Sequence, residues 1–378
     1  MNRELVNPFR PSAGAEPPVL IGRDRVLNDF AQGLREGVGA PARLMRITGP
    51  RGSGKTVLLT ELGDMARKRG WCVVDVTASE GLVVDIAHAL AKREGSTTFE
   101  GGVNLGVASA RMSRAYSEDA VTLRDVLTDT ASELTKRGTG LLVTVDEIQD
   151  AAEEDVRLIA ASVQHLIRER MNISFVFAGI TTGVMDLING RALTFLRRAK
   201  AEELAAIPLD EVALALRASI EQSGLQVAPE ALDYAADATK GYAFLVQLVG
   251  YHVWREGASH AGISTLLTQN DAKIGVREAL REFNNTVHES AISDLPLRAV
   301  EYLLAMADGP VVVATKDVAE RLGAPASSLT SYRRLLIKRQ VIEPTARGYV
   351  KFSIPYIREF LLENREELLA RYGVETDC

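Results

Sequence analysis

Short apolar runs alternate with amphipathic stretches along the first half of the chain. The runs cover 44–48, 71–77, 141–147 and 173–179, and each has the length of a buried strand. Between them, apolar residues recur at helical spacing over 23–36, 57–70, 82–93, 122–137 and 154–171. Strands that alternate with helices predict parallel pairing through helical crossovers. We therefore expect an α/β fold around a parallel sheet core.

The pattern after Pro208 is helical. It predicts helices over 209–223, 229–239 and 242–256, and then over 297–306, 315–322, 326–340 and 356–371, with an alternating stretch at 341–354. This divides the chain into an extended tail (1–18), a core (19–208), a helical segment (209–292) and a C-terminal domain (293–378). The glycine-containing segment 95–120 is expected to be an inserted hairpin or a mobile loop.

Length and composition narrow the class of protein. A chain of 378 residues is expected to form two or three domains. Its net charge of −6 gives no global attraction to DNA, so any nucleic-acid contact needs a local basic patch. The two cysteines, Cys72 and Cys378, form no disulfide framework and fit a reducing, cytoplasmic location. The scattered histidines suggest no structural metal, and no apolar run is long enough to span a membrane.

A glycine-rich loop carries the clearest chemistry. It matches the pattern G-x-x-x-x-G-K-[ST] and stands between a predicted strand and a predicted helix. Glycines allow backbone N–H groups to turn onto phosphate oxygens, and the helix adds its positive N-terminal field. The loop therefore predicts binding of ATP with Mg²⁺, with Lys55 facing the β- and γ-phosphates and Thr56 facing the metal. Its residues are Gly49, Pro50, Arg51, Gly52, Ser53, Gly54, Lys55 and Thr56.

Two carboxylates end the most apolar of the predicted strands. Asp146 and Glu147 follow the run Leu-Leu-Val-Thr-Val, at the carboxyl edge where open α/β sheets bind ligands. Asp146 is placed to hold Mg²⁺, and Glu147 is placed to polarise the attacking water as a general base. The alternative is that the pair only caps the following helix.

These motifs, with the helical segment after them, resemble AAA+ ATPases. The resemblance covers roughly residues 18–370 and points to the origin-recognition-type and STAND-related bacterial and archaeal branch. It implies a P-loop NTPase fold with a helical lid and a C-terminal winged helix-turn-helix. It also implies hydrolysis of ATP to ADP and phosphate, and assembly into nucleotide-dependent homo-oligomers.

The resemblance also suggests roles for five residues outside the two motifs. Gly22 and Arg23 match the segment near the adenine, although an ordinary helix start is the alternative. Thr181 matches the first sensor, although it can also be a turn threonine. Arg197 or Arg198 matches the arginine finger that reaches a neighbouring subunit, and the alternative is a solvated basic helix face.

The sequence departs from this family at the second sensor. Relatives carry a Gly-x-Pro turn or an arginine there, whereas this chain has Gly241-Tyr242-Ala243 with Lys240 as the nearby cation. This departure favours slow turnover or a nucleotide switch over brisk hydrolysis.

The C-terminal domain resembles a winged helix whose second helix would be 327–339. That segment is basic and contains no acidic residue, so it is available to a major groove or to phosphates. Protein docking or an intramolecular clamp is the alternative. The predicted DNA contacts are Ser328, Thr330, Ser331, Arg333 and Arg334 on the helix, with Arg347 and Lys351 on the wing.

Three functions remain open at this stage. The first is an ATPase that couples its nucleotide state to duplex DNA binding. The second is a STAND-type signalling switch whose winged helix clamps the lid or docks a protein partner. A small-molecule kinase is the weakest of the three, because no substrate-pocket motif is evident.

Overall fold

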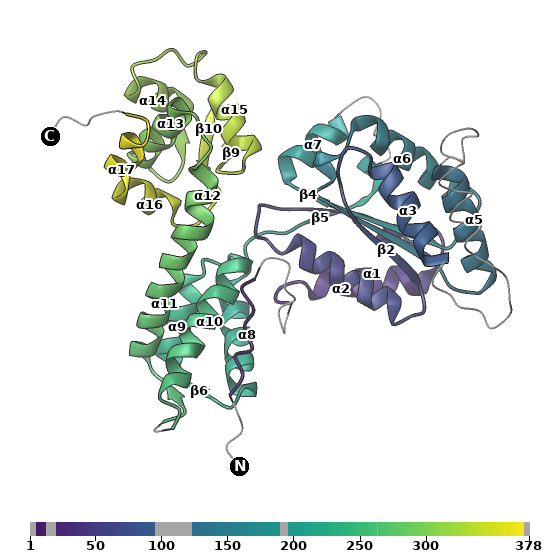
Figure 1. The fold of residues 1–378 in the computed structure, drawn as a ribbon, viewed down its shortest axis with the longest axis horizontal. Coiled ribbons are helices and arrows are strands. Elements are labelled where there is room, and N and C mark those ends of the chain that lie inside the picture. The colour runs from purple at the N-terminus through teal and green to yellow at the C-terminus, as the bar shows by residue number, and fades with distance from the viewer. Residues whose placement is uncertain (1–4, 13–19, 95–122, 190–195, 263, 374–378) are drawn as a thin grey trace. The chain divides into compact units, whose positions relative to one another are not determined.

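The computed structural model describes residues 5–12, 20–94, 123–189, 196–262 and 264–373 (Figure 1). The predicted insertion at 95–120 lies outside these residues. Contacts divide the chain into two compact units. We call residues 22–49 and 54–205 the sheet unit. The helical unit comprises residues up to 21, the loop tip 50–53 and residues 206–378.

The sheet unit is built on five parallel strands in the order β2-β3-β4-β1-β5. They are β1 (Leu44–Thr48), β2 (Cys72–Thr77), β3 (Leu141–Asp146), β4 (Ile173–Gly179) and β5 (Lys200–Glu203). Every residue of β3 and β4 is buried, as expected for strands covered on both faces. The predicted α/β fold with a parallel sheet core is therefore confirmed.

Strand β5 was not predicted, because its sequence is polar. Arg197 and Arg198, for which a solvated basic helix face was the alternative to an arginine finger, are both exposed, and both roles stay predictions. Leu196–Arg198 forms one turn of 3-10 helix, and the strand follows it. An edge strand buries few side chains, so it carries little hydrophobic pattern. Glu202 is buried but pairs with Arg25 and Lys200, which compensates its charge.

Helices cover both faces of the sheet (Figure 1). α1 (Asp24–Glu36) and α2 (Lys55–Arg67) lie on one face, and α3 (Leu82–Glu94), α5 (Leu123–Lys136) and α6 (Glu153–Arg168) lie on the other. α7 (Thr181–Asn189) follows β4. One hydrophobic cluster joins β2, β3 and β4 to α3, α5 and α6. This packing fixes where each strand ends, and therefore where the loops begin.

The helical unit contains a bundle of longer helices. They are α8 (Leu209–Gln222), α9 (Pro229–Ala238), α10 (Ala243–Ser259) and α11 (Gln269–Phe283), with a parallel pair of short strands, β6 (Gln226–Val227) and β7 (Leu266–Leu267). Residues 5–12 of the predicted extended tail form no helix or strand and pack on this bundle. Phe9 is 4% exposed, and Asn7 donates to the carbonyl of Tyr251 at 3.1 Å.

The C-terminal part of the helical unit has a separate hydrophobic cluster. A π-helical turn (Asn284–His288) and α12 (Glu289–Ile292) lead to α13 (Leu297–Ala307), α14 (Thr315–Arg321), α15 (Thr330–Lys338), α16 (Ile357–Glu363) and α17 (Arg365–Ala370). Three antiparallel strands accompany them, namely β8 (Val313–Ala314), β9 (Ile342–Ala346) and β10 (Tyr349–Phe352), in the order β8-β10-β9. Among the described residues, no helix combines the length and apolar character that a membrane crossing requires.

A buried arginine secures the end of α1. Arg43 is 6% exposed, and it donates to the carbonyls of Gly33 at 2.9 Å and Leu34 at 3.0 Å. Its guanidinium also bonds the Asn172 side chain and lies 4.8 Å from the ring centroid of Trp71. Burial lowers the pKa of Arg43. The side chain satisfies carbonyls that a helix C-terminus otherwise leaves unpaired.

We expect Arg43→Leu to destabilise the sheet unit by about 2–3 kcal/mol, because two buried carbonyls lose their donors. Urea unfolding should be followed through Trp71 in a Trp254→Phe background, so that the fluorescence reports on this unit. The exposed neighbour Arg35 is the control, and Arg35→Leu should change the free energy of unfolding by less than about 0.5 kcal/mol. Equal effects of the two variants would refute the capping role.

Candidate nucleotide site

The glycine loop has the backbone conformation that a phosphate cradle needs. Gly52 and Gly54 have φ values of +73° and +88°, a region that L-residues rarely adopt. Gly54 is the N-cap residue of α2, so the helix N-terminus opens at the loop. Lys55 is 5% exposed and donates from Nζ to the carbonyl of Gly49 at 3.2 Å. The Lys55 side chain therefore lies across the glycine loop and contacts the first residue of that loop.

The two residues expected to hold Mg²⁺ are in direct contact. Thr56 donates from Oγ1 to Oδ2 of Asp146 at 2.5 Å, although 90 positions separate them in sequence. Asp146 is 8% exposed, and the Thr56 residue is exposed. A hydroxyl beside a carboxylate supplies the oxygen donors that Mg²⁺ prefers. The residues present therefore fit the metal that the sequence predicts.

The strand register explains this meeting. Thr48 at the end of β1 pairs with Gly179 at the end of β4, and β3 is the next strand after β4. Parallel strands present their carboxyl ends at one edge. The loop after β1, the acidic pair after β3 and Thr181 after β4 consequently start from the same edge of the sheet.

Glu147 adopts an unusual backbone conformation beside Asp146. Its φ of +50° lies in the left-handed region, where non-glycine residues are uncommon. Its N–H donates to Oδ1 of Asp146 at 2.9 Å. Neighbouring Gln149 donates from Nε2 to Oε2 of Glu147 at 2.7 Å. No sequence pattern singles out Gln149, since an isolated polar residue after the acidic pair belongs to no motif.

Tyr242 is a second residue that the sequence analysis did not assign. Its hydroxyl donates to the carbonyl of Arg51 at 2.6 Å, within the helical unit. Burial raises the pKa of Tyr242 to about 12, so the hydroxyl keeps its proton near neutral pH. A Cβ at Gly52 would lie 2.2 Å from this hydroxyl oxygen. Lys240, the nearby cation, instead pairs with Asp237 at 2.9 Å.

Gly22 and Arg23 stand at the start of α1. Gly22 has a φ of +67°, and Arg23 is 7% exposed and donates to the Gly22 carbonyl at 3.4 Å. Thr181 is half-buried in the first turn of α7. The roles near the adenine and at the first sensor stay predictions.

The two predicted finger arginines lie at the far end of β5. Arg197 and Arg198 are exposed, and Arg197 donates from Nε to the carbonyl of Ile188 at 3.1 Å. They precede the first residue of β5, whereas the phosphate loop follows the carboxyl end of the neighbouring strand β1. A strand of this length spans about 10–15 Å. They therefore lie at the edge of the sheet opposite the phosphate loop of the same chain, and the arginine-finger role stays a prediction.

The predicted DNA-contacting residues differ in exposure. Ser328, Thr330, Ser331, Arg334 and Arg347 are exposed. Arg333 is half-buried, and its Nε has no hydrogen-bond partner among the described residues. Lys351 is half-buried and pairs with Glu343 at 2.8 Å. Helix α15 starts at Thr330, later than the predicted 326, because the carbonyl of Pro325 accepts a turn hydrogen bond from Ser328.

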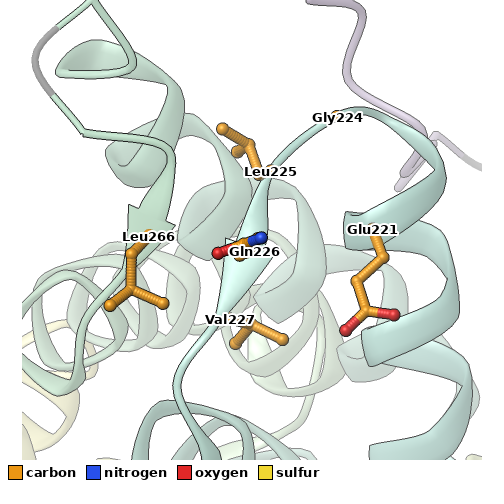
Figure 2. Close-up of a pocket in the computed structure, with 6 residues that line it drawn as sticks. All are labelled: Glu221, Gly224, Leu225, Gln226, Val227 and Leu266. Atoms are coloured by element: carbon orange, nitrogen blue, oxygen red, sulfur yellow. The ribbon is translucent and has the colours of Figure 1, made fainter.

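A pocket of about 480 Å³ lies elsewhere, in the helical unit. Figure 2 shows β6 and β7 lining it together with the end of α8. Its only charged lining residue is Glu221, and no phosphate-binding or catalytic residue of the predicted site contributes to it. We therefore do not assign the nucleotide to this pocket.

Comparison with family models identifies two regions of the chain. Residues 19–176 match the model described as AAA ATPase domain. Residues 285–361 match a model described as Domain of unknown function (DUF8462). No curated protein sequence matches the chain.

Comparison with solved structures extends over nearly the whole chain. The ORC2 protein of Aeropyrum pernix, solved as ADPNP–ADP complexes, is 16% identical with a TM-score of 0.61, covering 96% of this chain and 98% of that one. The ADP form of the same protein is 16% identical with a TM-score of 0.55, and the same shares of the two chains are covered. Cdc6p from Pyrobaculum aerophilum is 16% identical with a TM-score of 0.50, covering 96% of this chain and 97% of that one. The chain therefore shares the α/β fold of these ORC/Cdc6 structures, and its residues 19–176 are similar to the AAA ATPase domain model.

Proposed function

We propose that this protein is an ATPase that binds ATP with Mg²⁺ at the glycine loop and hydrolyses it slowly to ADP and phosphate. The hydrogen bond between Thr56 and Asp146 carries the proposal, because it brings the two predicted metal-binding groups together beside Lys55. The loop geometry and the match to an AAA ATPase domain support the same reading.

Each residue of the site has a role in this proposal. Lys55 turns from the Gly49 carbonyl to the β- and γ-phosphates, and Thr56 with Asp146 would hold Mg²⁺, which neutralises phosphate charge. Glu147 accepts a proton from water as the water oxygen attacks the γ-phosphorus. The bond from that phosphorus to the bridging oxygen breaks, and ADP and phosphate leave. Thr181 would hydrogen-bond the γ-phosphate or the water.

Slow turnover follows from the second-sensor segment. Lys240 pairs with Asp237, and Tyr242 contacts the carbonyl of Arg51 at the loop tip. A neutral hydroxyl supplies no positive charge to the transition state, whereas an arginine would. An arginine finger from a second copy, at Arg197 or Arg198, would supply charge in a nucleotide-dependent homo-oligomer.

We also propose that the C-terminal part is a winged helix that binds duplex DNA. The element order of that motif matches helices α13, α14 and α15 with strands β8, β9 and β10. Arg334 on α15 and Arg347 beside β10 are both exposed. We expect ATP or ADP at the loop to change the affinity for duplex DNA.

Lys55→Ala should weaken ATP binding at least ~100-fold, because the proposal gives its ammonium the charge-assisted contacts with the β- and γ-phosphates. Binding is measured by titration with a fluorescent ATP analogue. Lys68→Ala removes an exposed lysine just past the end of α2 and should leave the affinity unchanged. ATP affinity within about threefold of wild type in Lys55→Ala would place the nucleotide elsewhere.

Glu147→Gln should keep ATP binding and lower the hydrolysis rate by about 100- to 10,000-fold, since the amide cannot accept the proton. Single-turnover release of labelled phosphate separates chemistry from product release. Hydrolysis at the wild-type rate would remove Glu147 from the mechanism.

Arg334→Glu combined with Arg347→Glu should weaken duplex binding at least ~10-fold at low salt and reduce the salt dependence by about two ions. Mobility-shift titrations with ATP, with ADP and without nucleotide provide the measurement. The charge-matched control is Arg217→Glu with Arg255→Glu, two exposed positions on α8 and α10. Equal duplex affinity in both double variants would favour the signalling-switch alternative, in which ADP is retained and the C-terminal part docks protein.

A further inference from the structure

Gln149 lies in the single 3-10 turn after β3, and its side-chain amide is bonded at both ends. Nε2 donates to Oε2 of Glu147 at 2.7 Å, and Oε1 accepts from the backbone N–H of Ile180 at 3.0 Å. A backbone N–H can only donate, so the amide oxygen must face Ile180. The nitrogen is then left facing the carboxylate, and the bonding pattern fixes the amide orientation.

Two glycines make room for this side chain. A Cβ at Gly179 would lie 2.4 Å from Oε1 of Gln149, and a Cβ at Gly183 would lie 2.6 Å from its Cβ. Both separations are far inside van der Waals contact, so no larger residue fits at either position without moving Gln149. Gly179 ends β4, and Gly183 lies in the first turn of α7. The slot is therefore formed by the segment that carries Thr181.

The backbone of Glu147 is held as firmly as its side chain. Its left-handed φ of +50° is fixed from both sides. The Glu147 N–H donates to Oδ1 of Asp146 at 2.9 Å, and the Asp150 N–H donates to the Glu147 carbonyl at 2.8 Å. A residue in this sparsely populated region needs surrounding contacts to stay there. Gln149 supplies the one hydrogen bond to the Glu147 carboxylate found in the described part of the chain.

We propose that Gln149 is a positioning residue that joins the candidate base Glu147 to the turn leading into Thr181. The amide occupies Oε2 of the carboxylate and leaves Oε1 to accept a proton from water. Its other end fixes the Ile180 N–H, next to the candidate sensor. The two hydrogen bonds of Gln149 thereby fix the candidate base and the candidate sensor relative to each other. This inference rests on the proposed function, since it concerns the same ATPase site.

Exchanging the donor and the acceptor of the hydrogen bond between Gln149 and Glu147 tests this contact through stability, independently of ATPase activity. Gln149→Glu keeps the shape and the acceptor for Ile180 but puts two carboxylates together, and it should lower the melting temperature of the sheet unit by about 2–4 °C. Adding Glu147→Gln restores a donor on the opposite side. The double variant should therefore recover most of the loss, with unfolding followed through Trp71 in the Trp254→Phe background. A double variant no more stable than Gln149→Glu would overturn the inference.

Kinetics tests the positioning role. Gln149→Glu should lower kcat about 10- to 100-fold with KM for ATP within about twofold. Gln149→Asn, which keeps the amide on a shorter stem, should recover part of kcat. An unchanged kcat, or equal losses in kcat and ATP affinity, would also overturn it.

The two proposals fail in different ways. If Glu147→Gln alone hydrolyses ATP at the wild-type rate, the proposed base is wrong. The stability exchange still reports whether Gln149 holds the side chain at 147. If Glu147→Gln is inactive but the stability exchange and kcat show no effect of Gln149, only the positioning role is lost.

Discussion

The register between β1 and β4 is the constraint on which the candidate site depends. It sets Thr48 beside Gly179, and the next strand, β3, delivers Asp146 to the same edge. A shift of one residue in any of these strands would turn buried side chains to the opposite face. Both faces of β3 and β4 are closely packed, so side chains moved to the other face would not fit their new neighbours. The hydrophobic core therefore opposes such a shift. The 2.5 Å contact between Thr56 and Asp146 is a consequence of that packing.

Around this edge the chain accepts local strain where chemistry is expected. Gly52 and Gly54 take left-handed conformations at no steric cost, whereas Glu147 takes one as an L-residue and must be held there. Gln149 and the adjacent slot formed by Gly179 and Gly183 provide part of that hold. A carboxylate that is already held in one orientation needs less reorganisation to reach the transition state than a freely rotating one. The reaction barrier is lower for that reason. Positioning of this kind uses neutral groups, so it leaves the charge of the base intact.

The helical unit contains the segment that corresponds to the second sensor. The Gly241-Tyr242-Ala243 segment has neither the proline nor the arginine expected from the resemblance, and Tyr242 donates to the carbonyl of Arg51. This contact involves a neutral hydroxyl and a carbonyl, so it supplies no positive charge. Slow hydrolysis is therefore part of the proposed function, as is the DNA contact proposed for the exposed arginines of the C-terminal part.

The sequence by itself determined the strands β1 to β4, the glycine loop and the acidic pair. These features are local, since apolar period, glycine spacing and strand-end carboxylates are each visible within about ten residues. Tertiary structure alone decided the polar edge strand β5, which is held by the pairing of Glu202 with Arg25. It also turned Arg333 partly inward and drew Phe9 onto the helical bundle. Gln149 and Tyr242 emerged only in three dimensions, because their partners at Ile180 and Arg51 lie 31 and 191 positions away. Contacts over such separations leave no periodic or compositional trace in a single sequence.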